Sequence, residues 1–179
     1  MKIVVLQGSP NIKGSTNILV EKFTQGAEEA GHSVQRFDVA RMKIKSCLGC
    51  WACHAEEKCA QHDDEDAIRA AILDADMIAF ASPLYYFNIT SQLKTVIDRF
   101  CAFNTSLMNK KMKCAWLSVG ADVSDWMFDA IDSQAKTMGR YLQFELVGAV
   151  YGKGCGTPEE TAASVYPQKA YELGKSLKG

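Results

Sequence analysis

The chain has 179 residues, of which 47% are hydrophobic and 23% are charged, and its formal net charge is -1. These values are typical of one globular domain and exclude a disordered chain. The near-zero charge argues against partners such as nucleic acid or an anionic membrane. No stretch approaches the ~20 apolar residues of a membrane span, and the apolar run at residues 3–6 is too short for a secretory signal. We therefore expect a cytoplasmic protein, in which seven cysteines need an explanation other than disulfides.

Short apolar runs alternate with helical patterns along the chain. In chain order, the sequence predicts a strand at residues 2–7, a helix at 15–31, a strand at 33–38, a helix at 64–75, a strand at 76–81, a helix at 89–101, a strand at 113–119, a helix at 123–139, a strand at 142–150 and a helix at 158–177. Ser15 and Thr157 are the candidate N-caps, and Gly31 and Gly139 are candidate helix ends.

This alternation predicts an α/β fold with right-handed crossovers and a parallel sheet covered on both faces. The expected architecture is a doubly wound three-layer sandwich with strand order 2-1-3-4-5, in which residues 46–62 form a cysteine-rich insertion. Sheets of this kind bind ligands beyond the carboxyl ends of their strands, at the point where the strand order reverses. The loops after the first and third strands are therefore the candidate binding loops.

The first of these loops, residues 8–17, brings small and hydroxyl-bearing side chains to the start of a helix. Backbone N–H groups and the helix dipole make such a place suitable for an anion such as phosphate. Lys13 precedes Gly14, so the segment is not a nucleotide triphosphatase loop, and it also lacks the G-x-G-x-x-G dinucleotide fingerprint. An ordinary capped turn between strand and helix is the alternative interpretation.

The second loop, residues 82–91, contains three consecutive aromatic residues, Tyr85, Tyr86 and Phe87. Loops usually lie at the surface, and a flat, partly apolar ligand ring would account for aromatic side chains in such a place. The alternative is that these side chains fold back into the core.

Together, the two loops resemble the NADPH-dependent FMN reductase and flavodoxin-like flavoprotein family. The matching stretches run from Gly8 to Asn17 and from Ser82 to Arg99. The resemblance implies one flavodoxin-like FMN-binding domain over residues 1–179, with no catalytic side chain because FMN carries the chemistry, and with NAD(P)H as electron donor. The implied FMN contacts are Ser9, Asn11, Ser15, Thr16 and Asn17 at the phosphate, Pro83, Leu84, Tyr85, Tyr86, Phe87 and Asn88 along the ring, and Gly120 in a third loop.

Four cysteines, Cys47, Cys50, Cys53 and Cys59, are spaced as C-x2-C-x2-C-x5-C. Three thiolates at three-residue spacing can surround one face of an iron–sulfur cubane, although the proline of the ferredoxin run is missing. Nearby histidines keep zinc open, but structural zinc sites usually join two separated pairs of ligands. A redox-sensing thiol site and a set of buried small hydrophobic residues are further alternatives.

The cysteine segment also resembles the compact cysteine motif of iron–sulfur flavoproteins, a branch of the same family. This resemblance implies a [4Fe–4S] cluster that is held by the four cysteines and exchanges electrons with FMN, whereas other relatives have a similar segment and no cluster. Relatives commonly assemble into homodimers or homotetramers, and the resemblance implies the same here.

These observations predict an FMN-dependent oxidoreductase. It would transfer electrons from NAD(P)H or a reduced ferredoxin-type donor to an unidentified small-molecule or protein acceptor. The alternatives are a non-enzymatic electron carrier and a thiol- or zinc-based redox sensor on the same scaffold. Outside the two loops, we expect Cys101 and Cys114 in the core, Arg99 in helix packing or surface pairing, and the acidic run 63–66 as a solvated helix start.

Overall fold

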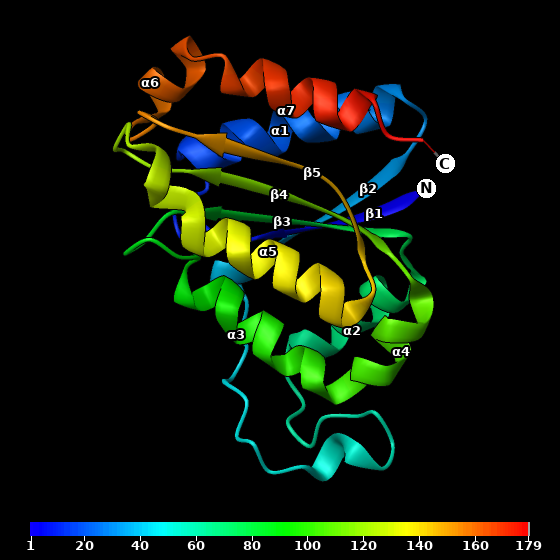
Figure 1. Cartoon of the computed structure of the whole chain (residues 1–179). Helices are drawn as coiled ribbons and strands as arrows, with labels where there is room; N and C mark the ends of the chain where they lie inside the picture. Colours follow the sequence, from blue (N-terminus) through cyan, green and yellow to red (C-terminus); the bar gives the residue numbers. More distant parts are fainter. Residues whose placement is uncertain (179) are drawn as a thin grey trace.

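The computed structural model describes residues 1–178 and contains a five-stranded parallel sheet with the order β2-β1-β3-β4-β5 (Figure 1). The strands are β1 (Lys2–Gln7), β2 (Ser33–Asp38), β3 (Met77–Pro83), β4 (Lys113–Val119) and β5 (Glu145–Gly152). All four strand pairings are parallel. The predicted flavodoxin-like fold class and strand order are therefore confirmed.

Seven α-helices are present in residues 1–178, together with four short 3-10 turns. The helices are α1 (Ser15–Glu29), α2 (Glu65–Asp74), α3 (Ser91–Arg99), α4 (Asn104–Lys110), α5 (Asp129–Leu142), α6 (Pro158–Ala163) and α7 (Tyr166–Lys175). Helices α1, α6 and α7 cover one face of the sheet, and α2 to α5 cover the other (Figure 1). None of the helices in this part of the chain is long and apolar enough to span a membrane.

Two apolar layers, one on each face of the sheet, form the core. Successive strand residues point to opposite faces, so in β1 the side chains of Ile3 and Val5 pack with α1, while those of Val4 and Leu6 pack toward α2. Because both faces are covered, β1 is continuously apolar in sequence, as parallel strands of this class are.

Several predicted helix boundaries are wrong. Ser15 is not the N-cap of α1, because Gly14 occupies the cap position with an extended backbone (φ -82°). Gly14 is also the last residue of a turn, in which its N–H donates to the Asn11 carbonyl. Helix α5 does not end at Gly139 but continues to Leu142, where Gln143 adopts the left-handed conformation that commonly ends a helix.

The predicted helices near residues 101 and 164 also differ from the structure. The helix predicted to run to residue 101 ends at Arg99, and a 3-10 turn (Phe100–Phe103) and the unpredicted α4 follow. The last predicted helix is divided into α6 and α7 because Ser164 is extended. Its predicted start is confirmed, since Thr157 and Glu160 form a reciprocal capping box around Pro158.

The cysteine segment, residues 46–62, connects β2 to α2 with little regular structure apart from a 3-10 turn at Ala52–His54. Figure 1 shows this connection leaving the sheet after β2 and running beneath α3 and α4 as the lowest part of the view. Only its start therefore lies at the carboxyl edge of the sheet.

Candidate functional site

Three loops follow the carboxyl ends of β1, β3 and β4, and we call residues 8–17, 82–91 and 118–122 the edge loops. Buried hydrogen bonds join them to one another. The Thr90 hydroxyl donates to the Gly8 carbonyl (2.8 Å), the Thr90 N–H donates to the Ser82 hydroxyl (2.9 Å), and the Ser118 hydroxyl donates to the Ser82 carbonyl (2.7 Å). These contacts bring together the loops that the sequence predicted as binding loops.

Gly8 is required where the first edge loop approaches α3. A Cβ at this position would lie 2.6 Å from Cβ of Leu93 and 2.8 Å from Oγ1 of Thr90. Any larger residue would therefore push the first loop away from the second, and the sequence places glycine at the point of contact.

The first edge loop is folded by its own polar groups and leads into a helix start without a side-chain cap. The Ser9 hydroxyl accepts from the Asn11 N–H (3.2 Å), and the Asn11 side chain accepts from the Lys13 N–H (3.1 Å). Gly14 then precedes α1, so the first N–H groups of this helix are available to a ligand. The predicted turn before a helix N-terminus is present.

Two buried polar atoms at this loop lack partners among residues 1–178. They are Oγ1 of Thr16, in a residue that is 1% exposed, and Nε2 of Gln7 at the end of β1. Buried polar groups are nearly always hydrogen-bonded, so such atoms indicate a missing partner such as a bound ligand. The sequence predicted Thr16, but it did not single out Gln7, which reads as the last residue of a strand.

The second edge loop displays its aromatic residues instead of burying them. Tyr85 and Asn88 exchange backbone hydrogen bonds of 2.8 and 3.1 Å across a two-residue turn. Tyr86 and Phe87 occupy this turn with φ of 46° and 64°, values that non-glycine residues rarely adopt. Tyr86 is 97% exposed, and Tyr85 and Phe87 are also exposed. The alternative that the three side chains fold back into the core is therefore wrong.

A cavity of about 320 Å³ lies between the second and third edge loops. Leu84, Tyr86, Phe87, Gly120 and Met127 are among its lining residues. A Cβ at Gly120 would lie 2.1 Å from Cε of Met127, so glycine lets the Met127 side chain lie against this loop. Met127 belongs to a 3-10 turn that the sequence did not associate with the site.

Several predicted contact groups already have partners within the chain. The Asn17 amide donates to Glu21 (2.7 Å), the Asn88 side chain accepts from the Ile89 N–H (2.8 Å), and the Gly120 N–H donates to the Gly152 carbonyl (2.9 Å). Asn11 is exposed at the tip of its loop. The remaining predicted residues, Ser9, Ser15, Pro83 and Leu84, lie at least partly buried along the edge loops.

The four clustered cysteines line a cavity of 180 Å³ beneath α3. Cys47 and Cys50 are exposed, whereas Cys53 and Cys59 are half-buried, and all are free thiols. Within residues 1–178, no three cysteine, histidine, aspartate or glutamate side chains are grouped closely enough to hold a metal ion. The segment is therefore not arranged as a closed single-ion site of the zinc type.

Cys101 is a fifth thiol at the cysteine cavity, so the prediction that it belongs to the core is wrong. The reason is that α3 ends at Arg99, and the following 3-10 turn rotates Cys101 away from the apolar face of the helix. Its carbonyl accepts from the Cys53 thiol at 3.8 Å. Burial, together with the neighbouring Cys47 and Cys53, raises the pKa of the Cys101 thiol. Cys114 is buried as predicted.

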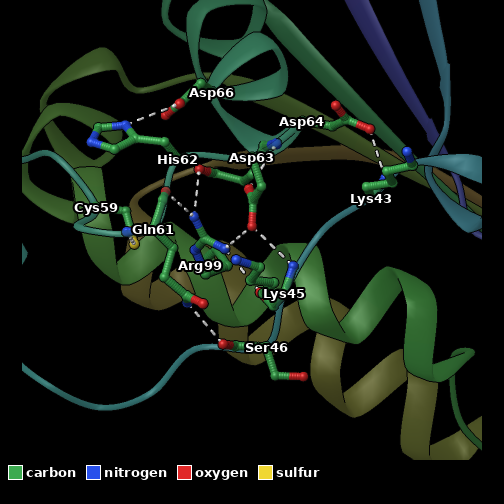
Figure 2. A network of polar contacts seen from close by, with 11 residues as sticks. Lys43, Lys45, Ser46, Cys59, Gln61, His62, Asp63, Asp64, Asp66 and Arg99 are labelled. Atoms are coloured by element: carbon green, nitrogen blue, oxygen red, sulfur yellow. Dashed lines mark hydrogen bonds and ion pairs between the residues drawn. The ribbon is translucent and has the colours of Figure 1, made fainter.

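The acidic run 63–66 is a solvated helix start only in part: Asp64 and Asp66 are exposed, whereas the side chains of Asp63 and Glu65 are buried. The Asp63 carboxylate accepts from the Lys45 N–H (3.0 Å), and the Asp64 carboxylate accepts from the Lys43 N–H (2.6 Å) (Figure 2). Burial raises the pKa of the Glu65 carboxyl to about 7. Asp63 and Asp64, which follow the cysteine segment, thus join its far side to the chain that precedes it.

The edge loops and the cysteine segment are separate regions of one chain. The cavity at the aromatic turn and the cavity lined by the cysteines have no lining residue in common. The cysteine segment runs beneath α3 and α4, and this course separates it from the edge loops (Figure 1).

Comparisons with known proteins give the same assignment as the fold. A family model described as NADPH-dependent FMN reductase matches residues 1–151. An iron–sulfur flavoprotein of Archaeoglobus fulgidus is 35% identical over 103 residues, which cover 58% of this chain and 47% of that protein. The chain thus spans about half the length of that relative.

Two further matches extend over more of the chain. An iron–sulfur flavoprotein of Methanosarcina thermophila is 30% identical over 141 residues, covering 71% of this chain and 73% of that protein. The solved structure of an NAD(P)H:quinone oxidoreductase from Methanothermobacter marburgensis has the same fold, with a TM-score of 0.72 at 18% identity over 99% of both chains. The chain therefore belongs to the NADPH-dependent FMN reductase family and has a flavodoxin-like fold.

Proposed function

We propose that this chain binds FMN on its edge loops and uses it to transfer electrons from NAD(P)H, or from a reduced ferredoxin-type donor, to an acceptor that has yet to be identified. The observation that carries the proposal is the pair of buried, unpartnered donors on Gln7 and Thr16, next to the uncapped start of α1 and one strand away from an exposed aromatic turn.

The phosphate end of FMN fits the first edge loop. The Thr16 hydroxyl would donate to a phosphate oxygen, and so would the free N–H groups at the start of α1. A phosphate would thereby satisfy a buried hydroxyl that lacks a partner within residues 1–178. Ser9 and Ser15 lie on the same loop and complete a set of small polar residues around the anion.

The ring end of FMN fits the aromatic turn. The aromatic turn offers flat apolar surface on Tyr85, Tyr86 and Phe87, next to the cavity that Gly120 helps to line. Phe87 packs against Trp126 with ring centroids 5.0 Å apart, which holds one side of the turn in place. A bound ring would cover this apolar surface and exclude water from it.

FMN, when bound, accepts a hydride and releases electrons singly or in pairs, and the chain needs no catalytic acid or base for this chemistry. The tasks of the chain are to bind the phosphate, to orient the ring and to leave one ring face open to the donor and acceptor. The hydrogen bonds among Gly8, Ser82, Thr90 and Ser118 keep the loops for phosphate and ring at a fixed separation.

We further propose that Cys47, Cys50, Cys53 and Cys59 hold a [4Fe–4S] cluster. Their spacing, their common cavity and the names of the archaeal relatives support this. The four thiolates would be the ligands of the cluster irons. Such a cluster supplies one-electron chemistry. Because the two cavities of one chain are separate, we also propose a homodimer or homotetramer that brings the cysteine segment close to a second chain's edge loops.

The test is an anaerobic purification followed by absorbance spectroscopy, iron and zinc analysis and assays of NADH and NADPH oxidation. We expect about one FMN per chain, about four irons per chain and oxidation of a reduced nicotinamide. Flavin without iron would contradict the cluster alone. Flavin that no nicotinamide reduces would favour a plain electron carrier, and failure to bind FMN after reconstitution would contradict the whole proposal.

A further inference from the structure

Arg99, the last residue of α3, is buried, with 1% of its surface exposed. The guanidinium donates to the carbonyls of Lys45 (2.8 Å) and Gln61 (3.2 Å), to Asp63 (3.0 Å) and to Glu65 (3.5 Å) (Figure 2). Arginine is almost never fully buried unless it is paired, and these contacts supply that pairing. Arg99 therefore packs and pairs as predicted, but its pairing is buried and not at the surface.

The two carbonyl contacts of Arg99 lie at the two ends of the cysteine segment. Lys45 immediately precedes residues 46–62, and Gln61 is next to the last residue of the segment. One guanidinium therefore connects the residues at which the chain enters the segment with those at which it leaves. We call this point, where the two ends of the segment meet, its base. The Gln61 side chain also connects the two ends of the segment, because it donates to the Ser46 carbonyl (2.9 Å).

The planar fork of arginine is suited to this bridge. Its two terminal nitrogens serve different ends of the segment: Nη1 donates to Lys45 and Asp63, and Nη2 donates to Gln61 and Glu65. A lysine ammonium carries the same charge as a single point and cannot span both ends in this geometry.

Cys59 lies beside this guanidinium. It precedes Gln61 by two residues, and Cys59 and Arg99 line the same 180 Å³ cavity. Burial lowers the pKa of the Arg99 guanidinium, but Asp63, Cys59 and Glu65 more than offset this and raise it. The positive charge thus forms part of the wall that the thiols face.

We propose that Arg99 is the positioning residue of the cysteine segment: it closes the base of the segment and holds Cys59 at the cavity that the other thiols line. The closure depends on the protein alone. Its consequence, that Arg99 helps the thiols to retain a cluster, rests on the proposed function.

Alkylation of the metal-free, FMN-loaded full chain tests the closure. Iodoacetamide would be used and each cysteine followed by mass spectrometry in the Arg99→Met and Arg99→Lys variants. Opening of the base should raise the alkylation rate of Cys59 by about tenfold or more in Arg99→Met, and by less in Arg99→Lys. The matched control is Lys94→Met on the same helix, where an exposed lysine pairs with Asp98; it should leave the Cys59 rate unchanged.

Buried Cys114 reports whether each variant is still folded. An unchanged Cys59 rate in Arg99→Met, with Cys114 still protected, would overturn the proposal. If Arg99→Met exposes Cys114 as well, that variant is unfolded and the Asp63→Asn variant is used instead. It keeps Arg99 and weakens only the ion pair between Arg99 and Asp63. A selective rise at Cys59 in that variant would support the proposal, and no selective rise would overturn it.

Iron retention separates this inference from the proposed cluster. After anaerobic reconstitution with iron and sulfide, Arg99→Met should lose iron to a chelator several-fold faster than Lys94→Met does. Equal rates of loss would overturn the role of Arg99 in retention. If the unsubstituted protein takes up no iron, the proposed cluster fails, while the alkylation result still decides whether Arg99 closes the segment.

Discussion

The edge loops are tied together by neutral hydrogen bonds, whereas the cysteine segment is tied down by charges. Thr90, Ser82 and Ser118 join the loops through hydroxyl and backbone groups. Arg99, Asp63 and Glu57 fasten the cysteine segment through a guanidinium and carboxylates. The loops should therefore keep their geometry over a wide range of pH, while the cysteine segment should respond to pH and to single charge changes. A substitution in one region should also leave the other unaffected, because the two cavities share no lining residue.

The largest expected effect comes from breaking the neutral network with Thr90→Val. The substitution leaves the buried Gly8 carbonyl and the Leu93 N–H without their side-chain partner, which costs about 3 kcal/mol of unfolding free energy. FMN affinity should fall as the loops separate. Denaturant unfolding and flavin fluorescence titration measure both effects.

Thr90→Ser is the matched control because it keeps the hydroxyl. It should stay within about 1 kcal/mol of the unsubstituted protein, since only a methyl group is lost. If Thr90→Val binds FMN as tightly as Thr90→Ser, the proposed link between the two loops has no role in flavin binding.

Removing the unpartnered hydroxyl with Thr16→Val should act on the ligand and not on the fold. A hydrogen bond to a charged phosphate contributes about 1.5–3 kcal/mol, so FMN affinity should fall about tenfold to hundredfold. Riboflavin, which lacks the phosphate, should bind both proteins equally. Calorimetric titration with the two flavins measures the difference, and Thr24→Val, later on the same helix, should leave both affinities unchanged. Equal losses for the two flavins would place the phosphate elsewhere.

Glu65 gives the cysteine segment a pH dependence that the edge loops lack. Because burial raises its pKa from the ordinary 4.5 to about 7, the folded protein binds this proton more tightly than the unfolded chain does. Glu65 therefore costs no stability below about pH 4.5, and the cost grows as pH rises to about 7 and then stays constant.

Replacing Glu65 with glutamine should remove this cost. The unfolding free energy of Glu65→Gln, relative to the unsubstituted protein, should rise by about 2 kcal/mol between pH 5 and pH 8. Urea unfolding at the two pH values measures this, and Glu28→Gln at an exposed position of α1 should show no such rise. A difference that is independent of pH would show that Glu65 does not titrate in this range.

The smallest effect is expected at the tip of the cysteine segment. Glu57 accepts hydrogen bonds from the Ser106 hydroxyl and N–H, and this contact lowers the pKa of its carboxyl. Ser106→Ala removes one half-buried side-chain hydrogen bond and keeps the backbone one, so it should cost only about 1 kcal/mol. Hydrogen exchange at residues 52–58 should become faster, while exchange in the edge loops should not change. A change in the edge loops instead would contradict the independence of the two regions.

The fold could be predicted because its signals are local. Each buried strand is largely apolar, as in residues 2–7 and 113–119, and small polar residues mark the turn that leads into α1. The exposed aromatic turn was also predictable, since three aromatic residues follow the end of a strand.

The anchoring of the cysteine segment was not predictable, because its partners are distant in sequence and contradict the usual behaviour of charged residues. Arg99 and Glu65 read as surface residues by type, and their pairing becomes visible only after α2 and α3 are placed side by side. Cys101 was misplaced because the end of α3 falls two residues earlier than its pattern indicates. Gln7 was missed because an unpartnered amide cannot be recognised without its surroundings.

The most direct test of the central claim is amide hydrogen exchange of the purified protein with and without FMN. We predict that FMN protects residues 8–17, 82–91 and 118–122. Protection confined to other parts of the chain, or no protection at saturating FMN, would contradict the assignment of the edge loops as the flavin site.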